Sequence, residues 1–401
     1  MSTETAAGSA SGLCPAGIDP YHPGALVDPY PFYRRLRSRG PATYVPGRGI
    51  WLVSHYEHAA AVLRDYRAFV SGQGAGYTRV PDHGYRYPLI DNDPPEHTRA
   101  RRSVQNLFGR AAIDELRPGV RAAAVDLVEA AATAGEIDAV TALALPLPDR
   151  TIRLLTGIQP PDGATMATWG DAVGQLGAAD LDPEMVRIAT ESLEWLIAEG
   201  VPALPPYCMG RTIMEHGGDN GGLEDGRERL MMLDSIWLAG IDSSSSSLGN
   251  AISAFADFPQ QWDMIRANPG LIPNAVEEVL RFDAPFRSFY RRTVAETDIG
   301  GVPIPADSDV CVLLGAANRD PDRFTDPDRL DVTRADAKSH LSFGTSIHLC
   351  IGAPVARLEL TELITALAAR VRRFERIGDA VRAPNQAMRK YASLPVRLVT
   401  D

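Results

Sequence analysis

The chain has few cysteines, no excess of positive charge and no long hydrophobic run. Its four cysteines, Cys14, Cys208, Cys311 and Cys350, show no Cys-x-x-Cys spacing, which argues against a disulfide framework and favours a reducing compartment. A net charge of −11 excludes the basic surface that nucleic-acid-binding proteins carry. No stretch reaches the ~20 apolar residues of a membrane-spanning helix, and residues 1–17 lack the apolar segment of a signal peptide. We therefore expect a cytoplasmic protein that binds neither nucleic acid nor membrane.

Helical periodicity dominates what is present. Hydrophobic residues make up 45% of the 401 residues, enough for a large core. The small, polar residues 1–20 predict a disordered tail. Helices are expected over residues 28–38, 55–65, 93–102, 118–132, 148–155, 163–176, 183–199, 223–258, 271–282 and 353–370. Short strands are expected at residues 42–45, 50–53, 293–299, 301–304, 310–314 and 394–399, and residues 202–226 read as a connection. The sequence thus predicts a mainly α fold with small β-sheets.

Residues 66–92 contain no regular period. Several glycines and prolines interrupt this segment, and it also carries Tyr77, Tyr85, Arg86 and Tyr87. A loop of this length is either a mobile surface excursion or a functional segment. The aromatic residues favour a loop that covers a ligand.

The helix over 223–258 carries polar residues in its apolar middle. Asp242 is followed by five serines, Ser243 to Ser247. Glycine and serine are poor interior residues of a helix, so a kink is expected here. A buried carboxylate is costly unless it is paired. Satisfied serines in a locally hydrated helix would explain the pattern equally well.

The stretch from Ser342 to Gly352 places Cys350 immediately before the helix over 353–370. The free N–H groups and the dipole of a helix N-terminus favour thiolate. Gly344 and Gly352 allow the backbone to approach a large flat ligand closely. On these grounds alone Cys350 is either a nucleophile or a soft metal ligand.

Four ordered motifs resemble those of the cytochrome P450 superfamily, the haem-thiolate monooxygenases, in its soluble bacterial form. The pattern Phe-Gly-x-Gly-x-His-x-Cys-x-Gly is matched at Phe343, Gly344, His348, Cys350 and Gly352, with Ser346 in place of the second glycine. The Glu-x-x-Arg pair is matched at Glu278 and Arg281, and Ala-Gly-x-acid-Thr at Ala239, Gly240, Asp242 and Ser243, with serine replacing threonine. The tract Ala-Ala-Asn-Arg-Asp-Pro over 316–321 is also similar to bacterial members. The resemblance covers nearly the whole chain from residue 28.

The resemblance implies the cytochrome P450 fold, a triangular prism with haem b between the long central helix and the cysteine helix. It implies a single domain over residues 21–401, acting as a monomer, with Cys350 as the axial thiolate. Glu278 and Arg281 would be a structural pair, and Asp242 and Ser243 would deliver protons during oxygen activation. The implied cofactor-binding residues are His97, Arg101, Arg291, His348, Phe343, Gly344, Gly352, Ala239 and Gly240. Alone, His97 and Arg101 would read as a solvated helix stripe.

The resemblance also implies external redox partners. No flavin domain or iron–sulfur cysteine set is present, so electrons are expected from a ferredoxin and an NAD(P)H-dependent ferredoxin reductase. A local basic patch of Arg99, Arg102, Arg110 and Arg357 would steer an acidic partner. Scattered surface arginines are the alternative.

The substrate pocket is expected over the haem face opposite Cys350. Its implied lining is aromatic and suits a small aromatic substrate: Tyr85, Arg86, Tyr87, Ser235, Leu238, Phe286 and Phe289. The pattern is similar to members that O-demethylate substituted benzoic acids, where Arg86 would face an anionic or phenolic group. The alternatives are hydroxylation of a larger specialised metabolite, a peroxide-driven haem enzyme, a cysteine hydrolase and a non-catalytic haem sensor.

Overall fold

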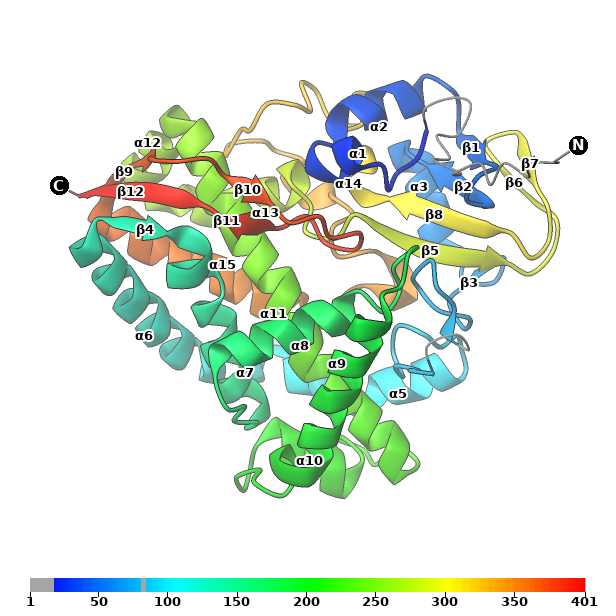
Figure 1. Ribbon diagram of the computed structural model, residues 1–401, viewed down its shortest axis with the longest axis horizontal. Coiled ribbons are helices and arrows are strands. Elements are labelled where there is room, and N and C mark those ends of the chain that lie inside the picture. Colours follow the sequence, from blue (N-terminus) through cyan, green and yellow to red (C-terminus); the bar gives the residue numbers. More distant parts are fainter. Residues whose placement is uncertain (1–17, 81–83, 401) are drawn as a thin grey trace, which may run out of the picture.

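The computed structural model of the protein describes residues 18–80 and 84–400 (Figure 1). Most of the predicted tail, residues 1–17, and with it Cys14, lies outside this part. The packed chain starts earlier than the expected residue 21. Ile18 is buried, and Asp19 forms an ion pair with Arg48 over 3.0 Å. These contacts anchor the first described residues to the β1–β2 turn.

Helices make up most of the described chain, as predicted. Their bounds are α1 Pro23–Val27, α2 Tyr30–Arg37, α3 Tyr56–Arg64, α5 Glu96–Val104, α6 Arg110–Ala134, α7 Pro146–Thr156, α8 Gly163–Gly174, α9 Pro183–Trp195, α10 Met209–His216, α11 Gly226–Asp257, α12 Pro259–Ala267, α13 Ile272–Phe282, α14 Leu314–Ala317 and α15 Ala353–Arg370. The bounds of α15, the helix after Cys350, match the predicted range. No helix among the described residues has the length and hydrophobicity needed to cross a bilayer.

Four small sheets accompany the helices. The largest has the order β1-β2-β8-β5-β3, built from Ala42–Val45, Ile50–Val53, Asp309–Leu313, Ser288–Thr293 and Phe69–Val70. The predicted hairpin is its edge, with Ala42 opposite Val53, and β2 pairs with β8 in parallel. A three-stranded sheet joins β4 (Glu136–Asp138), β12 (Pro395–Thr400) and β9 (Val371–Arg376). Two hairpins complete the set: β6 (Thr297–Ile299) with β7 (Val302–Ile304), and β10 (Val381–Arg382) with β11 (Tyr391–Ser393).

Two expectations about helices were wrong. Helix α6 begins at Arg110, well before the predicted residue 118, and Pro118 lies inside it. The segment 202–226 contains helix α10, although the sequence suggested only a connection. Cys208 caps α10 by accepting a hydrogen bond from the Arg211 amide, and Gly217 ends it in the left-handed conformation. A thiol cap is a weak signal in a sequence, because cysteine is not a usual N-cap residue.

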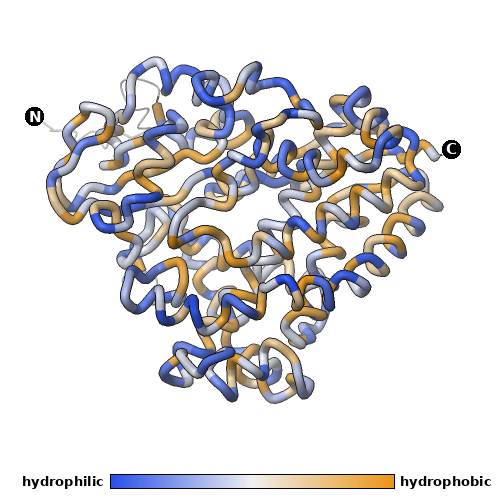
Figure 2. The backbone as a smooth tube through the Cα atoms, turned by 180° about the vertical axis from the view of Figure 1, so that it is seen from behind, coloured by the Kyte–Doolittle hydropathy of each residue, from blue (hydrophilic) through white to orange (hydrophobic). Residues whose placement is uncertain are grey.

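Helix α11 runs through the middle of the molecule, between the helical side and the sheet side (Figure 1). It is one continuous α-helix of 32 residues, so the kink expected at the serines does not break its α-helical hydrogen bonding. The serine hydroxyls are satisfied without water: Ser243, Ser246 and Ser247 each donate to the carbonyl four residues earlier. Viewed from behind, the long helices on the C-terminal side alternate between hydrophobic and hydrophilic colours, as helices with one buried face do (Figure 2).

Candidate active site

The loop before α15 places Cys350 at the start of that helix. The Cys350 amide donates to the Phe343 carbonyl over 2.9 Å, and both Gly344 (φ +67°) and Ser346 (φ +60°) are left-handed. Ser346 therefore adopts the turn geometry that glycine would supply. Burial raises the pKa of Cys350, and the amides of Gly352 and Ala353 oppose that rise. Cys350 is nevertheless an exposed residue. A residue deep in a protein has accessible surface when it faces an internal space.

A cluster of cationic and imidazole side chains lies close to Cys350. The His97 and His348 rings are 4.5 Å apart between centroids. Both nitrogens of His97, Nε2 of His348 and Nε of Arg291 are buried without a hydrogen-bond partner among the described residues. Burial, reinforced by Arg291, His97 and Arg101, lowers the pKa of His348 to about 3. Neither Arg101 nor Arg291 has an ion pair with another described residue, and burial lowers the pKa of Arg291 to about 10.

Two neighbouring arginines on β5, Arg291 and Arg292, differ in their hydrogen-bond and ion-pair partners. Arg292 forms an ion pair with Asp309 and donates to the carbonyls of Gly76 and Tyr77 over 3.2 Å each. Arg291 donates only to its neighbouring carbonyl, Tyr290 O, over 2.7 Å. Because the chain itself satisfies Arg292, Arg291 is the one left for an external anion, as the sequence predicted.

These residues fit a haem. Buried cations without counter-ions repel one another and pay a desolvation cost, so the cluster is built for an anion from outside the chain. The two carboxylates of a haem match it in charge, and a thiolate matches its iron. Ideal Cβ atoms on Gly344 and Gly352 would meet no atom closer than 3.5 Å and 3.9 Å, so a clash within the chain does not account for either glycine. The absent Cβ of Gly240 instead makes room for Ile152 of α7, at 2.6 Å, so helix packing accounts for this glycine.

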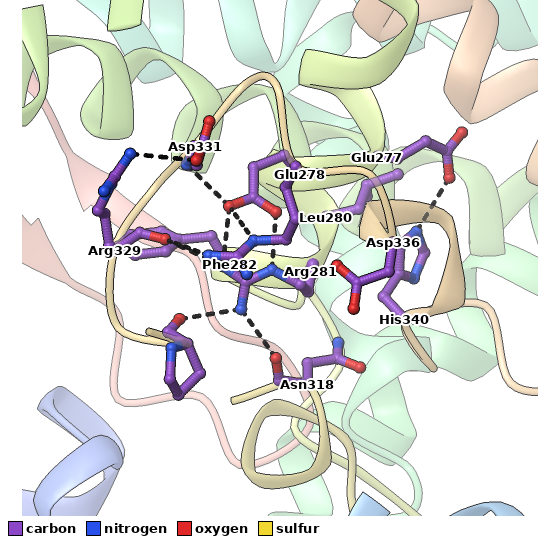
Figure 3. Close-up of polar contacts among 12 residues, drawn as sticks. Glu277, Glu278, Leu280, Arg281, Phe282, Asn318, Arg329, Asp331, Asp336 and His340 are labelled. Atoms are coloured by element: carbon purple, nitrogen blue, oxygen red, sulfur yellow. Dashed lines mark hydrogen bonds and ion pairs between the residues drawn. The ribbon is translucent and has the colours of Figure 1, made fainter. Parts of the chain in front are cut away.

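The pair Glu278 and Arg281 on α13 is fully buried and joined twice, over 2.7 and 2.9 Å. Arg281 also donates to the carbonyls of Asn318 and Pro327, while Glu278 accepts from the Asp331 amide and from Arg334 (Figure 3). The pair thereby satisfies the backbone of the irregular segment over 318–334. The pair holds the backbone in place, and it does not line either cavity described below.

A second set of contacts holds the cysteine loop. Asn318 accepts from the Leu341 amide over 2.7 Å and donates to the Ser342 hydroxyl over 2.8 Å. Glu277, the residue before Glu278 on α13, binds Arg357 of α15 over 2.6 Å. It also contacts His340 over 3.2 Å (Figure 3). The segments on both sides of Cys350 are therefore fixed to α13.

Asp242 on α11 is ion-paired by a residue that the sequence reasoning missed. Lys390 Nζ lies 2.7 Å from Asp242 Oδ1 and also contacts Asp171 of α8. Side-chain exposure falls from 34% at Asp171 through 17% at Lys390 to 6% at Asp242. Asp242 Oδ2 has no partner among the described residues. Burial raises the pKa of Asp242, and Lys390 opposes that rise.

The serines after Asp242 have separate partners. Ser243 donates to the Ala239 carbonyl over 2.7 Å. Ser244 donates to Glu359 of α15, a fully buried glutamate whose pKa burial raises to about 7. Glu359 was also missed; it is one of two buried glutamates on α15, the other being Glu362.

A cavity of about 190 Å³ lies beside α11. Its lining includes five of the predicted substrate residues, Tyr87, Ser235, Leu238, Phe286 and Phe289, together with Ala239 and Asp242. A second cavity of about 330 Å³ is lined by Asp171, Lys390 and Asp242. Asp242 therefore lines both cavities.

The predictions for Tyr85 and Arg86 were wrong, since neither lines the cavity. The Tyr85 hydroxyl bonds Thr190 of α9 over 2.7 Å. Arg86 donates to the carbonyls of Gly72 and Asp91 over 2.9 and 2.7 Å. The long loop uses its arginine to close on itself, because its backbone carbonyls have few other donors.

The loop over 66–92 does cover the cavity. Gly74, Ala75, Gly76 and Thr78 line it, and the Tyr77 amide donates to the Gly177 carbonyl over 2.8 Å. An ideal Cβ on Gly76 would lie 2.4 Å from Gly177 Cα, so only glycine permits this backbone contact. The described part of the loop therefore covers this cavity, and its covering of a bound ligand stays a prediction.

The expected basic patch is largely neutralised within the chain. Arg99 pairs with Glu228 over 2.7 Å, and Arg357 pairs with Glu277. Arg110 lies near Asp114, at 3.6 Å. The exposed Arg102 has no ion pair with a described residue.

Comparisons with known proteins agree with this site. Residues 227–390 match the family model described as Cytochrome P450. The chain is 32% identical to cytochrome p450 CYP199A2 of Rhodopseudomonas palustris, over 97% of this chain and 95% of that protein. It is 34% identical to cytochrome P450 monooxygenase PikC of Streptomyces venezuelae, over 92% and 91%. The structure of cytochrome P450 CREJ in complex with (4-ethylphenyl) dihydrogen phosphate matches with a TM-score of 0.82 and 28% identity, covering 93% of this chain and 98% of that one.

Proposed function

This chain belongs to the cytochrome P450 family of haem-thiolate monooxygenases, and we propose that it oxidises a compact aromatic substrate by hydroxylation or O-demethylation. The observation that carries the proposal is the buried cluster of His97, His348 and Arg291, whose nitrogens lack partners beside Cys350. Such a cluster fits a haem and has no evident use without one.

In this proposal Cys350 ligates the iron of haem b, and His97, Arg101, Arg291 and His348 bind its carboxylates. Bound haem supplies the chemistry that reduces O2 and inserts one of its atoms into the substrate. The weak basicity of His348 makes it a neutral hydrogen-bond donor at pH 7. That property argues against a cysteine hydrolase, which needs a base beside its thiol.

The cavity supports a compact substrate. A cavity of about 150 Å³ holds benzene, so about 190 Å³ suits a substituted ring. Phe286 and Phe289 lie 5.1 Å apart between ring centroids and offer aromatic contacts to such a ring. The description of PikC names no substrate, and that of CREJ names one bound molecule, so the substrate assignment depends on this chain's own lining.

Protons would reach the reaction through side chains of this chain. Asp171, Lys390 and Asp242 form a continuous polar series from the half-exposed surface to α11. The free oxygen of Asp242, which lines the cavity, and the hydroxyl of the next residue, Ser243, would hold and pass a proton. This pair favours O2-driven chemistry over a peroxide-driven reaction, which would not need proton delivery of this kind.

Electrons would come from a ferredoxin and its NAD(P)H-dependent reductase. The ion pairs of Arg99 and Arg357 reduce the positive field of the expected basic patch. Ferredoxin docking would therefore depend on shape and on Arg102 more than on long-range steering.

The proposal is tested with haem-loaded protein. The reduced protein with CO is expected to show the red-shifted band of thiolate ligation, and Cys350→Ser is expected to lose it. Turnover with NADH, ferredoxin reductase and ferredoxin should then give oxidised product from a substituted aromatic substrate. Haem binding without any turnover over a broad panel of such compounds would contradict the enzymatic proposal and favour a sensor.

A further inference from the structure

The charged side chains in the described lining of the 190 Å³ cavity are all acidic. Its described lining contains Asp91 and Asp242 but no lysine, arginine or histidine. Arg86, the cation expected to meet an anionic substrate, is held by backbone carbonyls outside the lining. A carboxylate substrate would therefore enter a site that offers it no counter-ion.

Asp234 is a further buried carboxyl beside this lining, although it is not itself a lining residue. It precedes the lining residue Ser235 on α11, is 1% exposed, and its Oδ1 has no hydrogen-bond partner among the described residues. The hydroxyl of Tyr87, another lining residue, is also buried without a partner. Asp234 and Tyr87 interact, since the carboxyl raises the pKa of the tyrosine after burial has raised it.

Asp91 closes the group from the loop. Its carboxyl accepts from the amides of Ala75 (3.3 Å) and Tyr87 (3.0 Å). Asp91 and Asp234 have no ion pair with any described residue, whereas Asp242 is neutralised by Lys390. Burial raises the pKa of Asp91 to about 6 and that of Asp234 to about 7. Two buried carboxyls without a counter-ion are costly unless a ligand supplies the positive charge.

We propose that Tyr87, Asp91 and Asp234 bind the cationic nitrogen of the substrate, so that the enzyme oxidises aryl-bearing amines and not aryl carboxylates. This inference rests on the proposed function, because it takes the cavity as the substrate site. The aromatic face of Tyr87 would add a cation–π contact to the charge of the two carboxyls.

The position of Asp234 on α11 also sets the site of oxidation. It lies eight residues before Asp242 on one continuous helix, which corresponds to about 12 Å along the axis at about 1.5 Å per residue. A nitrogen held at Asp234 therefore leaves the opposite end of the substrate near Asp242. Oxidation is expected at a carbon remote from the nitrogen, and N-dealkylation is not.

The test compares three probes of the same shape with haem-loaded protein: N,N-dimethyl-4-phenylbutylamine, 4-phenylbutan-1-ol and 4-phenylbutyrate. Binding is measured by the low-to-high-spin shift of the ferric haem and, independently, by calorimetry. The cation is expected to bind at least 10-fold more tightly than the carboxylate. A nitrogen that ligates iron would give the opposite spectral shift, so that binding mode is recognised and would overturn the proposal.

Asp234→Asn is expected to reduce cation affinity about 10-fold and to change alcohol affinity less than 3-fold. Asp257→Asn, an exposed position at the far end of the same helix, is the control. Cation affinity in the wild type should increase from pH 6 to pH 8 as Asp234 ionises, and this dependence should disappear in Asp234→Asn. Tyr85 and Glu194 also act on this region, and Arg86 acts on Asp91, but none of the three is changed by the substitution.

Equal or tighter binding of the carboxylate, or an unchanged cation preference in Asp234→Asn, would overturn the inference. If the alcohol binds and is turned over in that case, the proposed monooxygenase function stands and only the substrate charge is wrong. If no probe binds, the cavity is not the substrate site and both proposals fail at that point.

Discussion

Lys390 Nζ lies 2.7 Å from Asp242 Oδ1, and the same ammonium group contacts Asp171. One lysine near the β10–β11 hairpin thus fixes the carboxylate of the central helix and links it to a half-exposed acid. Its charge opposes the rise in the pKa of Asp242 that burial causes. This contact makes Lys390 a positioning residue for the proposed proton delivery.

Replacing Lys390 by Met is expected to slow product formation about 10-fold or more, since general acid–base groups contribute roughly 10²- to 10⁴-fold. Without the lysine the pKa of Asp242 rises further, so the acidic limb of the pH–rate profile should move to higher pH. The measurement is the profile of product formed per NADH, with the exposed Lys338→Met as control. An unshifted profile in Lys390→Met would remove the lysine from proton delivery.

Ser243→Ala is expected to increase the fraction of NADH lost as hydrogen peroxide. The side chain loses the hydroxyl beside Asp242, while the backbone of α11 is unchanged. Ser243→Thr keeps the hydroxyl and should retain coupling at or above that of the wild type, because threonine is stiffer at χ1. Peroxide and product are quantified together. Unchanged coupling in Ser243→Ala would transfer the role to Ser244, whose hydroxyl donates to Glu359.

Ser346→Gly is expected to stabilise the protein by about 0.5–1 kcal/mol. Ser346 has φ +60°, a conformation that costs a residue with a Cβ about 1–2 kcal/mol, and the added freedom of glycine in the unfolded chain returns part of this. Urea unfolding of the haem-loaded protein measures the difference. Ser346→Ala retains the Cβ and should show no gain; equal gains in both variants would disprove the backbone explanation.

Glu277→Gln is expected to lower stability in a pH-dependent way. Burial alone would raise the pKa of Glu277, but His340 and Arg357 outweigh it and lower the pKa from 4.5 to about 2. The ionised glutamate therefore stabilises the fold fully above pH 4.5, and this contribution is lost as the pH falls toward 2. We expect a cost of about 2–3 kcal/mol at pH 7 that decreases below pH 4.5. Urea unfolding at pH 7, 5 and 4 checks this, with the exposed Glu57→Gln as control; a constant difference would contradict it.

Local sequence patterns predicted much of the fold because their physical causes are local. The bounds of α15 follow from its apolar period, and the β1–β2 hairpin follows from two short apolar runs around a Pro-Gly turn. Helix α10 was missed because its cap is a cysteine. Helix α11 continues through its five serines, and hydroxyls of this run bond back to carbonyls of their own helix.

The site was predictable where a motif fixes spacing and less so where distant segments meet. The motif around Cys350 also locates Gly344 and His348, and the structure brings His97, Arg101 and Arg291 beside it. Lys390 lies 148 residues from Asp242, and no pattern in the chain relates the two. Arg86 was assigned to the cavity from its position in the loop, but only the folded loop shows that its guanidinium serves nearby carbonyls.

Asp242 lines both cavities, and its position would separate substrate binding from proton supply. A substrate that fills the first cavity displaces water from the side where oxidation takes place. The second cavity is lined by Asp171 and Lys390, so the proposed proton-delivering groups reach Asp242 from the side away from the substrate. The substrate cavity would exclude water while the opposite side of Asp242 keeps its polar proton-donating groups.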